Sequence, residues 1–273
     1  AFGNDVQRGE YLTRAAGCIS CHTDGKAGGK PFAGGRGLKT PFGIYYSPNI
    51  TADPETGIGG WSDPDFLNAV KRGIRPDGAH YFPVFPYTSY TQMLDADALA
   101  IKAYLFSLPT VRQKNREHDV SPPFSWRWPM MTWKLLHFDE GDFSPDKGRD
   151  DEWNRGAYLV NALAHCGECH TPRDSFGGPE TDLAYAGTTD GPEGAIVPNI
   201  TPDPETGIGD WSAGDLDFFL SLGMLPDGDV TGDVMYEVIE HGTSKLTAAD
   251  REAIAVFLQA LPPIRHAVER KKP

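Results

Sequence analysis

The sequence predicts an all-α protein built from two tandem copies of one helical domain with long loops rich in glycine and proline. The first observation is a repeat: residues 49–62 read NITADPETGIGGWS, and residues 199–212 read NITPDPETGIGDWS. The distance along the chain between the two copies is too long for a solenoid repeat, and it indicates a duplicated domain. The second observation is that apolar residues recur at helical spacing, whereas strand patterns are weak throughout. The third is the composition, because 31 Gly and 23 Pro among 273 residues favour long loops.

Two helices are predicted near the ends of the repeats, at 95–107 and 248–260, each ended by the following Leu-Pro. Apolar residues occupy positions i, i+3, i+4 and i+7 of both, which is the core-facing stripe of an amphipathic helix. In the first copy they are Ile101, Tyr104, Leu105 and Leu108, and in the second Ile254, Phe257, Leu258 and Leu261.

Two more helices should precede the cysteine motifs, at 5–16 and 151–164. Their Gly9 and Gly156 have no side chain, so the last helix of the same copy can cross closely there. A third helix is predicted after each repeated Trp-Ser. Ser62-Asp63-Pro64 is a favourable helix start, and Ser212 with Asp215 forms a capping box.

These patterns divide the chain into an N-terminal domain at 1–113, an aromatic interdomain linker at 114–150 and a C-terminal domain at 151–273. The linker includes the stretch SPPFSWRWPMMTWKLLHF. Because this stretch is too aromatic for a free tether, we expect it to pack between the two domains.

Charge and hydropathy exclude several classes of protein. There are 38 acidic and 25 basic residues, for a net charge of −13, which argues against binding nucleic acid or an anionic membrane. No apolar run approaches the length that spans a bilayer, so we expect no transmembrane segment. The start at Ala1 fits an exported protein whose signal has been removed after a small residue.

All four cysteines lie in two copies of the pattern Cys-x-x-Cys-His: Cys18, Cys21 and His22, and Cys166, Cys169 and His170. Two thiols at this spacing can add to the vinyl groups of haem, and the following histidine can supply one axial nitrogen. A zinc site is disfavoured by the distance between the pairs, and a redox dithiol lacks its βαβ setting. The sequence therefore predicts two covalently attached haem c groups, which form in an oxidising compartment such as the periplasm.

The second axial ligand differs between the copies. In the second copy, Met235 lies nine residues after Pro226, in a glycine-bearing loop before the last helix, and is the predicted iron ligand, although a lone methionine usually belongs to a core. Met224, beside a helix end, is the poorer candidate. In the first copy the equivalent position is Phe85, which cannot bind iron.

Three alternatives remain for the first copy. Met93 ranks first as a metal ligand, because a three-residue deletion relative to the second copy could bring it to the iron. Against this, it aligns with Leu246, an apolar residue that packs before a helix. Five-coordinate iron with Phe85 covering it ranks second, and His80 third.

Four repeated residues complete the candidate cofactor-binding set. Trp61 and Trp211 could lie on the haem edge and donate to a propionate, or could serve core packing alone. Asn49 and Asn199, in the repeated Asn-Ile-Thr, are also assigned to cofactor binding. Their match to a glycosylation sequon is better explained by the duplication.

With these motifs the chain resembles the diheme and triheme cytochrome c subunits of bacterial periplasmic dehydrogenases, of the quinoprotein alcohol dehydrogenase and molybdenum hydroxylase types. The shared marks are RGxYL before each Cys motif, CHTPRDSFGG, PNIT with TGIGxWS, FPVFPY and WRWPMMTWKLLHF. The resemblance implies two tandem class I cytochrome c domains. The quinoprotein branch has AMPY where this chain has VFPY at 84–87, so methionine ligation cannot be transferred to position 85. Only two Cys-x-x-Cys-His motifs occur in these 273 residues, so we do not expect the third haem domain of some relatives here.

The resemblance implies a periplasmic diheme cytochrome c that relays single electrons from a dehydrogenase to another cytochrome or an oxidase. No residue is assigned a catalytic role. The alternative is a diheme enzyme that acts on thiosulfate, peroxide or a gas at the N-terminal haem. All four cysteines are used for attachment and no acid–base group is evident near Phe85, which disfavours the first two substrates. A structural subunit of a larger complex is a third hypothesis.

Overall fold

The computed structural model describes residues 2–268 and divides the chain into two units, Ala1–Asp142 and Phe143–Pro273. Ala1 and residues 269–273, which the predicted domains 1–113 and 151–273 include, lie outside the described residues. Each unit contains its own Cys-x-x-Cys-His motif and is described here by itself.

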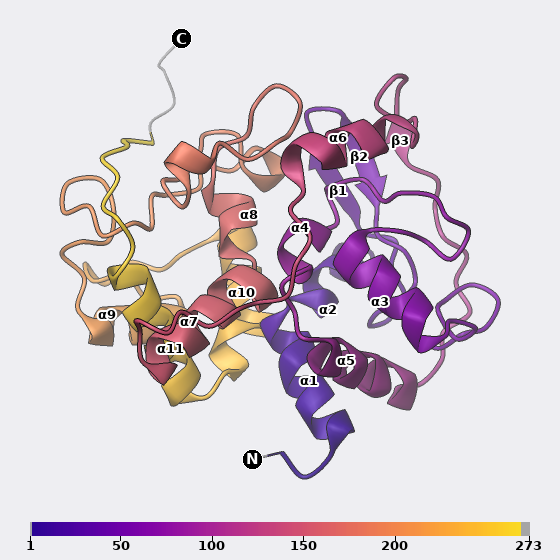
Figure 1. Ribbon diagram of the computed structural model, residues 1–273, viewed down its shortest axis with the longest axis horizontal. Helices are drawn as coiled ribbons and strands as arrows, with labels where there is room; N and C mark the ends of the chain where they lie inside the picture. The colour runs from indigo at the N-terminus through magenta and orange to yellow at the C-terminus, as the bar shows by residue number, and fades with distance from the viewer. Residues whose placement is uncertain (1, 269–273) are drawn as a thin grey trace. The chain divides into compact units, whose positions relative to one another are not determined.

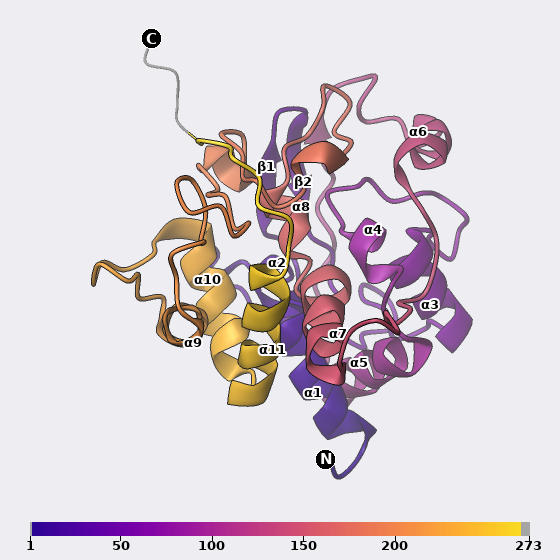
Figure 2. The same cartoon turned by 60° about the vertical axis from the view of Figure 1, so that its left-hand side comes forward.

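In the first unit, the first and last helices of the repeat cross at backbone contact. Helix α1 (Asp5–Ala15) lies beside α5 (Asp95–Ser107) (Figures 1 and 2). A Cβ atom added at Gly9 would lie 1.9 Å from the carbonyl oxygen of Ala100, which confirms the predicted close crossing. Beside this contact, Arg8 forms an ion pair with Asp97, which is buried in the first turn of α5.

The second unit repeats this crossing with α7 (Asp151–Tyr158) and α11 (Ala248–Gln259). A Cβ atom at Gly156 would lie 1.9 Å from the Ala253 carbonyl oxygen. Arg155 donates two hydrogen bonds to Asp250, from Nε at 2.8 Å and from a terminal nitrogen at 2.7 Å. The Arg-Gly pair of each copy therefore performs the same two tasks: close backbone contact and an ion pair to the last helix.

The predicted helix at 151–164 changes its geometry before it ends. After α7 the chain continues as a π-helical turn, η2 (Leu159–Leu163). The second copy has eleven positions from Arg155 to Cys166, where the first has ten from Arg8 to Cys18. A π-helical turn accommodates one extra residue, so the cysteine motif still follows the crossing directly.

The third predicted helix is present in both units, as α3 (Asp63–Arg72) and α9 (Ala213–Leu222). Both begin at a complete capping box, formed by Ser62 with Asp65 and by Ser212 with Asp215. The remaining helices and helical turns are α2 (Cys18–Cys21), η1 (Gly25–Ala27), α4 (Tyr87–Tyr90), α6 (Pro129–His137), α8 (Cys166–His170), η3 (Thr181–Leu183), η4 (Pro192–Gly194), α10 (Asp233–His241) and η5 (Thr243–Lys245).

The expectation of an all-α fold is wrong in one respect, because the first unit contains a small antiparallel sheet in the order β1-β2-β3. Its strands are β1 (Gly37–Thr40), β2 (Gly43–Tyr46) and β3 (Asp119–Val120). β2 contains Ile44-Tyr45-Tyr46, residue types that favour strands. Tyr45 is buried, with its ring centroid 5.0 Å from that of Phe82. Strands of two to four residues are too short to show a two-residue alternation in the sequence.

The aromatic segment predicted as a linker is divided between the units. Its residues up to Asp142 belong to the first unit, where Trp133 of α6 packs edge-on against Tyr87, with ring centroids 6.5 Å apart. From Phe143 onward the chain belongs to the second unit, and the Phe143 ring packs against Tyr158. Between residues 2 and 268, no helix has the length and apolar character needed to cross a membrane.

The helix crossing yields a stability prediction. Gly9→Ala should lower the free energy of unfolding of the haem-loaded protein by about 1–3 kcal/mol, because the added methyl group forces two backbones apart. Gly60→Ala is the matched control, since nothing lies within 4 Å of a Cβ atom there. Equal denaturant midpoints for the two variants would contradict the close crossing.

Candidate functional site

Each cysteine motif starts a new helical turn immediately after the first helix of its unit. Gly17, just before α2, has a φ of 62°, and His165, just before α8, has a φ of 43°. Such left-handed backbone turns the chain sharply, and a non-glycine residue adopts it at a cost. The turn places both cysteines of a motif on one short helix and the histidine at its end.

The two histidines have the same hydrogen bond. Nδ1 of His22 lies 2.8 Å from the carbonyl oxygen of Pro48, and Nδ1 of His170 lies 2.8 Å from that of Pro198. A carbonyl oxygen can only accept, so Nδ1 carries the ring proton and the lone pair is on Nε2. Burial lowers the pKa of both imidazoles, which favours the neutral form that a metal requires.

The first cysteine of each motif is held as a neutral thiol. Burial raises the pKa of Cys18 to about 12, and the neighbouring Cys21 adds to the effect. Burial raises the pKa of Cys166 to about 12 as well, with a further contribution from Cys169. Both cysteines are partly exposed, and their thiols stay protonated at neutral pH.

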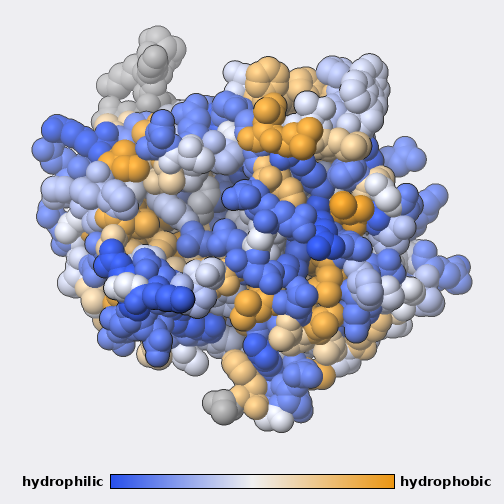
Figure 3. All heavy atoms as spheres, in the orientation of Figure 1, coloured by the Kyte–Doolittle hydropathy of each residue, from blue (hydrophilic) through white to orange (hydrophobic). Residues whose placement is uncertain are grey.

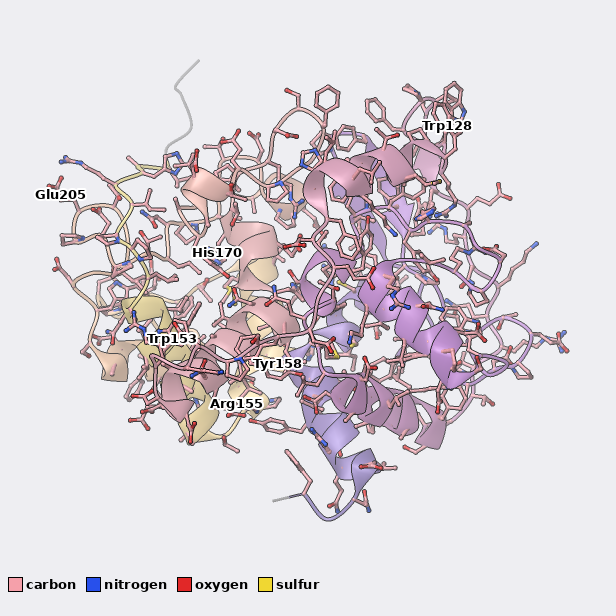
Figure 4. All side chains as sticks on the ribbon, in the orientation of Figure 1. Trp128, Trp153, Arg155, Tyr158, His170 and Glu205 are labelled. Atoms are coloured by element: carbon pink, nitrogen blue, oxygen red, sulfur yellow. The ribbon has the colours of Figure 1, made fainter. Side chains whose placement is uncertain are left out.

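The donor set fits haem c. Each unit offers two thiols on one helical turn and a neutral imidazole whose Nε2 is available to iron. His170 lies on α8 in Figure 4. Among residues 2–268, no group of three or more His, Cys, Asp or Glu side chains is arranged to hold a metal ion.

A hydrogen bond near the second site was missed by the sequence analysis. The Tyr185 hydroxyl donates to Oδ1 of Asn161, which lies in the π-helical turn. A Cβ atom added at Gly167 would lie 3.3 Å from the Tyr185 ring, so the ring packs on the cysteine helix. Burial raises the pKa of Tyr185, which keeps the hydroxyl a neutral donor.

The first unit lacks this pair, because Phe32 occupies the equivalent place. The backbone N–H of Phe32 donates to the Thr23 hydroxyl at 3.1 Å, and that of Tyr185 donates to the Thr171 hydroxyl at 3.1 Å. Both residues have left-handed backbone, with φ of 61° and 64°. The extra residue before Cys166 was the one feature of the sequence that could have indicated this difference between the two units.

Asn49 and Asn199 have structural partners in their own units. The Asn49 side-chain nitrogen donates to the Val111 carbonyl oxygen at 2.7 Å, and its oxygen accepts from the backbone and hydroxyl of Thr51. Asn199 has equivalent bonds, donating to the Ile264 carbonyl oxygen at 2.7 Å. Each asparagine thus fixes the segment after the last helix to the loop that carries the proline carbonyl.

Trp61 and Trp211 are both half-buried at the end of the repeated turn. The Trp211 ring packs edge-on against Phe219, with centroids 5.5 Å apart. The Trp61 carbonyl oxygen accepts from Nζ of Lys102 at 2.8 Å. These contacts anchor each tryptophan to its own unit, and a role at the haem edge stays a prediction.

The methionine candidates lie in different surroundings. Met235 is half-buried in the first turn of helix α10, not in a loop, because apolar residues of the segment 234–239 follow a helical period. Met93 is 1% exposed, just before α5, and Leu246 is 4% exposed, just before α11. Met93 and Leu246 thus occupy equivalent buried places before the last helix of their units. Because Leu246 can only pack there, this equivalence argues against Met93 as an iron ligand.

His80 is a poor iron ligand in this structure. Nζ of Lys134 lies 3.0 Å from Nδ1 of His80, and the lysine also donates to the carbonyl oxygens of Arg72 and Gly73. Burial lowers the pKa of Lys134 to about 8, so at neutral pH it is still mainly an ammonium donor. Nδ1 of His80 therefore accepts, and Nε2 carries the ring proton.

Phe85 is equivalent to Met235 in sequence, but it lies in a bend before α4 whereas Met235 lies in helix α10. Its ring packs edge-on against Tyr81 and Tyr90, with centroids 5.4 and 5.8 Å apart. The Tyr90 hydroxyl donates to the carbonyl oxygen of Ala16, at the end of α1, at 2.6 Å. The first unit therefore has an aromatic cluster where the second offers a thioether.

A helical unit with this cysteine helix and an Nδ1-anchored histidine is the pattern of the c-type cytochromes. The sequence profile named cytochrome c matches residues 6–109. The chain is also 41% identical over 269 residues to a "Diheme cytochrome c-type" of Cereibacter sphaeroides, covering 95% of this chain and 87% of that protein. The chain therefore belongs to the cytochrome c family, which supports covalently bound haem c and an electron-transfer role.

Two further relatives are subunits of dehydrogenases. The chain is 39% identical over 267 residues to the "Alcohol dehydrogenase (quinone), cytochrome c subunit" of Gluconacetobacter polyoxogenes, covering 95% of this chain and 56% of that protein. It is 40% identical over 265 residues to the "Gluconate 2-dehydrogenase cytochrome c subunit" of Pantoea cypripedii, covering 94% of this chain and 59% of that protein. The chain thus spans little more than half the length of these two relatives, and it resembles cytochrome subunits of dehydrogenases, as the sequence motifs indicated.

The Tyr185–Asn161 pair yields a second prediction. Tyr185→Phe should lower the free energy of unfolding by about 1–2 kcal/mol, because the Asn161 oxygen loses its donor in a partly buried place. The double variant Tyr185→Phe/Asn161→Leu should recover part of this loss, since neither polar group is then left unpaired. Denaturant unfolding of the haem-loaded variants measures both; a double variant less stable than the single one would contradict a pairwise role.

Proposed function

We propose that the chain is a periplasmic diheme cytochrome c that relays single electrons from a dehydrogenase partner to a downstream acceptor. Two tandem class I cytochrome c domains would each hold one haem c, at Cys18 and Cys21 and at Cys166 and Cys169. The observation that carries the proposal is the duplicated histidine anchor, with Nδ1 of His22 and of His170 each 2.8 Å from a proline carbonyl oxygen.

Bound haem supplies an iron that accepts and releases one electron. The protein's residues provide the conditions for this exchange. The proline carbonyls fix the orientation of His22 and His170 and favour the tautomer that binds iron through Nε2. The two thiols of each motif would hold the group by two covalent bonds, which would limit the reorganisation that accompanies each change of charge.

For the sixth position we propose Met235 in the second unit and Met93 in the first. Met235 is supported by its half-buried place in the first turn of α10. Met93 is preferred because the segment before the last helix is three residues shorter than in the second unit, and because a hydrogen bond occupies Nδ1 of its rival His80. The equivalent residue of the second unit is Leu246, so an aliphatic side chain can fill the same space. The substitution Met93→Leu should therefore test iron binding without disturbing the packing.

The third prediction counts methionine–iron bonds. Met235→Leu and Met93→Leu should each remove one methionine-to-iron charge-transfer band from the ferric spectrum, while the haem content is kept, since these swaps conserve side-chain volume. Met224→Leu is the control and should leave both bands. If Met93→Leu leaves the spectrum unchanged, Met93 is not a ligand of the first haem. Rapid carbon monoxide binding to the ferrous protein would then identify a five-coordinate iron there.

The fourth prediction tests the relay itself. The mass of the intact protein should show two attached porphyrins, and a reductive titration should take up two electrons per chain. The ferrous protein should bind carbon monoxide slowly or not at all, because both irons are six-coordinate. Turnover of peroxide or thiosulfate by the purified protein alone would favour the catalytic alternative and contradict the relay.

A further inference from the structure

Six large apolar side chains are exposed around helix α6 of the first unit. The most exposed are Leu135 (85%), Leu136 (73%) and Trp128 (70%). We call the set the α6 face: Phe124, Trp126, Trp128, Met131, Leu135 and Leu136. Figure 3 shows apolar surface over this helix, and Figure 4 shows Trp128 at the outer edge of the ribbon.

The opposite side of α6 is firmly anchored, so the face is held in a defined place. Trp133 packs against Tyr87, and Lys134 donates to the two carbonyl oxygens that end α3. The Lys134 ammonium also lies over the Tyr87 ring, 4.6 Å from its centroid. Trp128, Met131 and Leu135 follow the i, i+3, i+7 spacing of one helical stripe, which these anchors direct outward.

Ring contacts extend the face beyond the helix. The rings of Trp126 and Trp128 are stacked, with centroids 6.2 Å apart and an interplanar angle of 24°. Phe124 packs on Phe42 of the β1–β2 turn, with centroids 4.6 Å apart. The three aromatic side chains of the face are therefore held by ring contacts, and they lose little conformational freedom when a partner binds.

The charge of this segment differs from that of the rest of the chain. The stretch 120–138 contains no Asp or Glu, in a protein with 38 acidic residues among 273. Aromatic residues and methionine, with few acidic residues, are typical of the buried centre of a protein–protein interface. The six side chains expose on the order of 800 Å², which is the share that one partner contributes to a standard interface and more than most monomers expose in one patch.

We infer that the α6 face is the docking site for the dehydrogenase subunit, through an apolar surface of that subunit. This inference rests on the proposed function, because the partner is the electron donor named there. A dehydrogenase is favoured over a lipid bilayer because the net charge of −13 opposes binding to anionic membranes. The two cations of this segment also have partners within the unit, since Arg127 donates to the His80 carbonyl oxygen and Lys134 to that of Gly73. Two relatives are named as cytochrome c subunits of dehydrogenases, which makes a dehydrogenase the first partner to test.

The experiment uses the haem-loaded chain, isolated with an affinity tag from the organism that encodes it. The co-purified dehydrogenase is identified by substrate-dependent haem reduction with a panel of alcohols, aldoses, aldonates and heteroaromatic acids. Leu135→Glu/Leu136→Glu should weaken its binding at least about tenfold, with unchanged haem content and spectrum. Leu222→Glu is the matched control, since Leu222 is a 58% exposed leucine of α9, and it should retain the dehydrogenase.

Oxidative footprinting gives a second readout without a substitution. Met131, which is 60% exposed, should be oxidised in the free chain and protected in the complex, whereas the buried Met93 should stay protected in both. A dehydrogenase retained by the double variant would overturn the docking site but leave the relay intact. Failure of any dehydrogenase to co-purify with the wild-type chain would overturn both.

Three other outcomes would also overturn the inference by assigning the face to another occupant. Protection of Met131 from oxidation in the free monomer would show that the chain's own second unit covers the α6 face. A wild-type dimer that Leu135→Glu/Leu136→Glu dissociates would assign it to a second copy. Flotation with phosphatidylglycerol vesicles, abolished by the same variant and kept by Leu222→Glu, would assign it to a membrane.

Discussion

The contact on which each unit depends is the backbone crossing of its first and last helices. At Gly9 the two backbones touch, and this fixes where α1 ends and therefore where the cysteine helix begins. The same crossing fixes where the chain leaves α5. In the segment after α5, the Val111 carbonyl oxygen accepts a hydrogen bond from Asn49. The carbonyl oxygen of the neighbouring Pro48 accepts one from Nδ1 of His22. One contact thus positions the thiols from one side and the imidazole from the other.

The second unit follows the same path with other residues. Gly156 touches Ala253, and the chain beyond α11 presents the Ile264 carbonyl oxygen to Asn199. Pro198 then accepts from His170. The extra residue before Cys166 does not disturb this path, because the π-helical turn absorbs it. The two copies therefore share the helix crossing, the asparagine bond and the proline–histidine bond. The residues around these contacts differ: Tyr185 replaces Phe32, and Met235 replaces Phe85.

The sequence predicted the parts of the fold that depend on local patterns. The helices at 95–107 and 248–260, the glycine crossings and the capping box at Ser212 are seen in the structure, because periodicity and capping act within a few residues. The sheet was missed because its strands have only two to four residues, and because β3 pairs with β2 across more than seventy positions. The Tyr185–Asn161 bond and the Lys134–His80 contact also escaped, since both join distant segments.

The joint between the two units is very short. On one side, Asp142 forms an ion pair with Lys71, and on the other, Phe143 packs on Tyr158. Hardly any slack chain remains between these two anchored neighbours. The two units are thus covalently joined in one polypeptide, and dilution cannot separate them. If each unit holds a haem, as proposed, electron exchange between the two haems would be first-order and independent of the protein concentration in the cell.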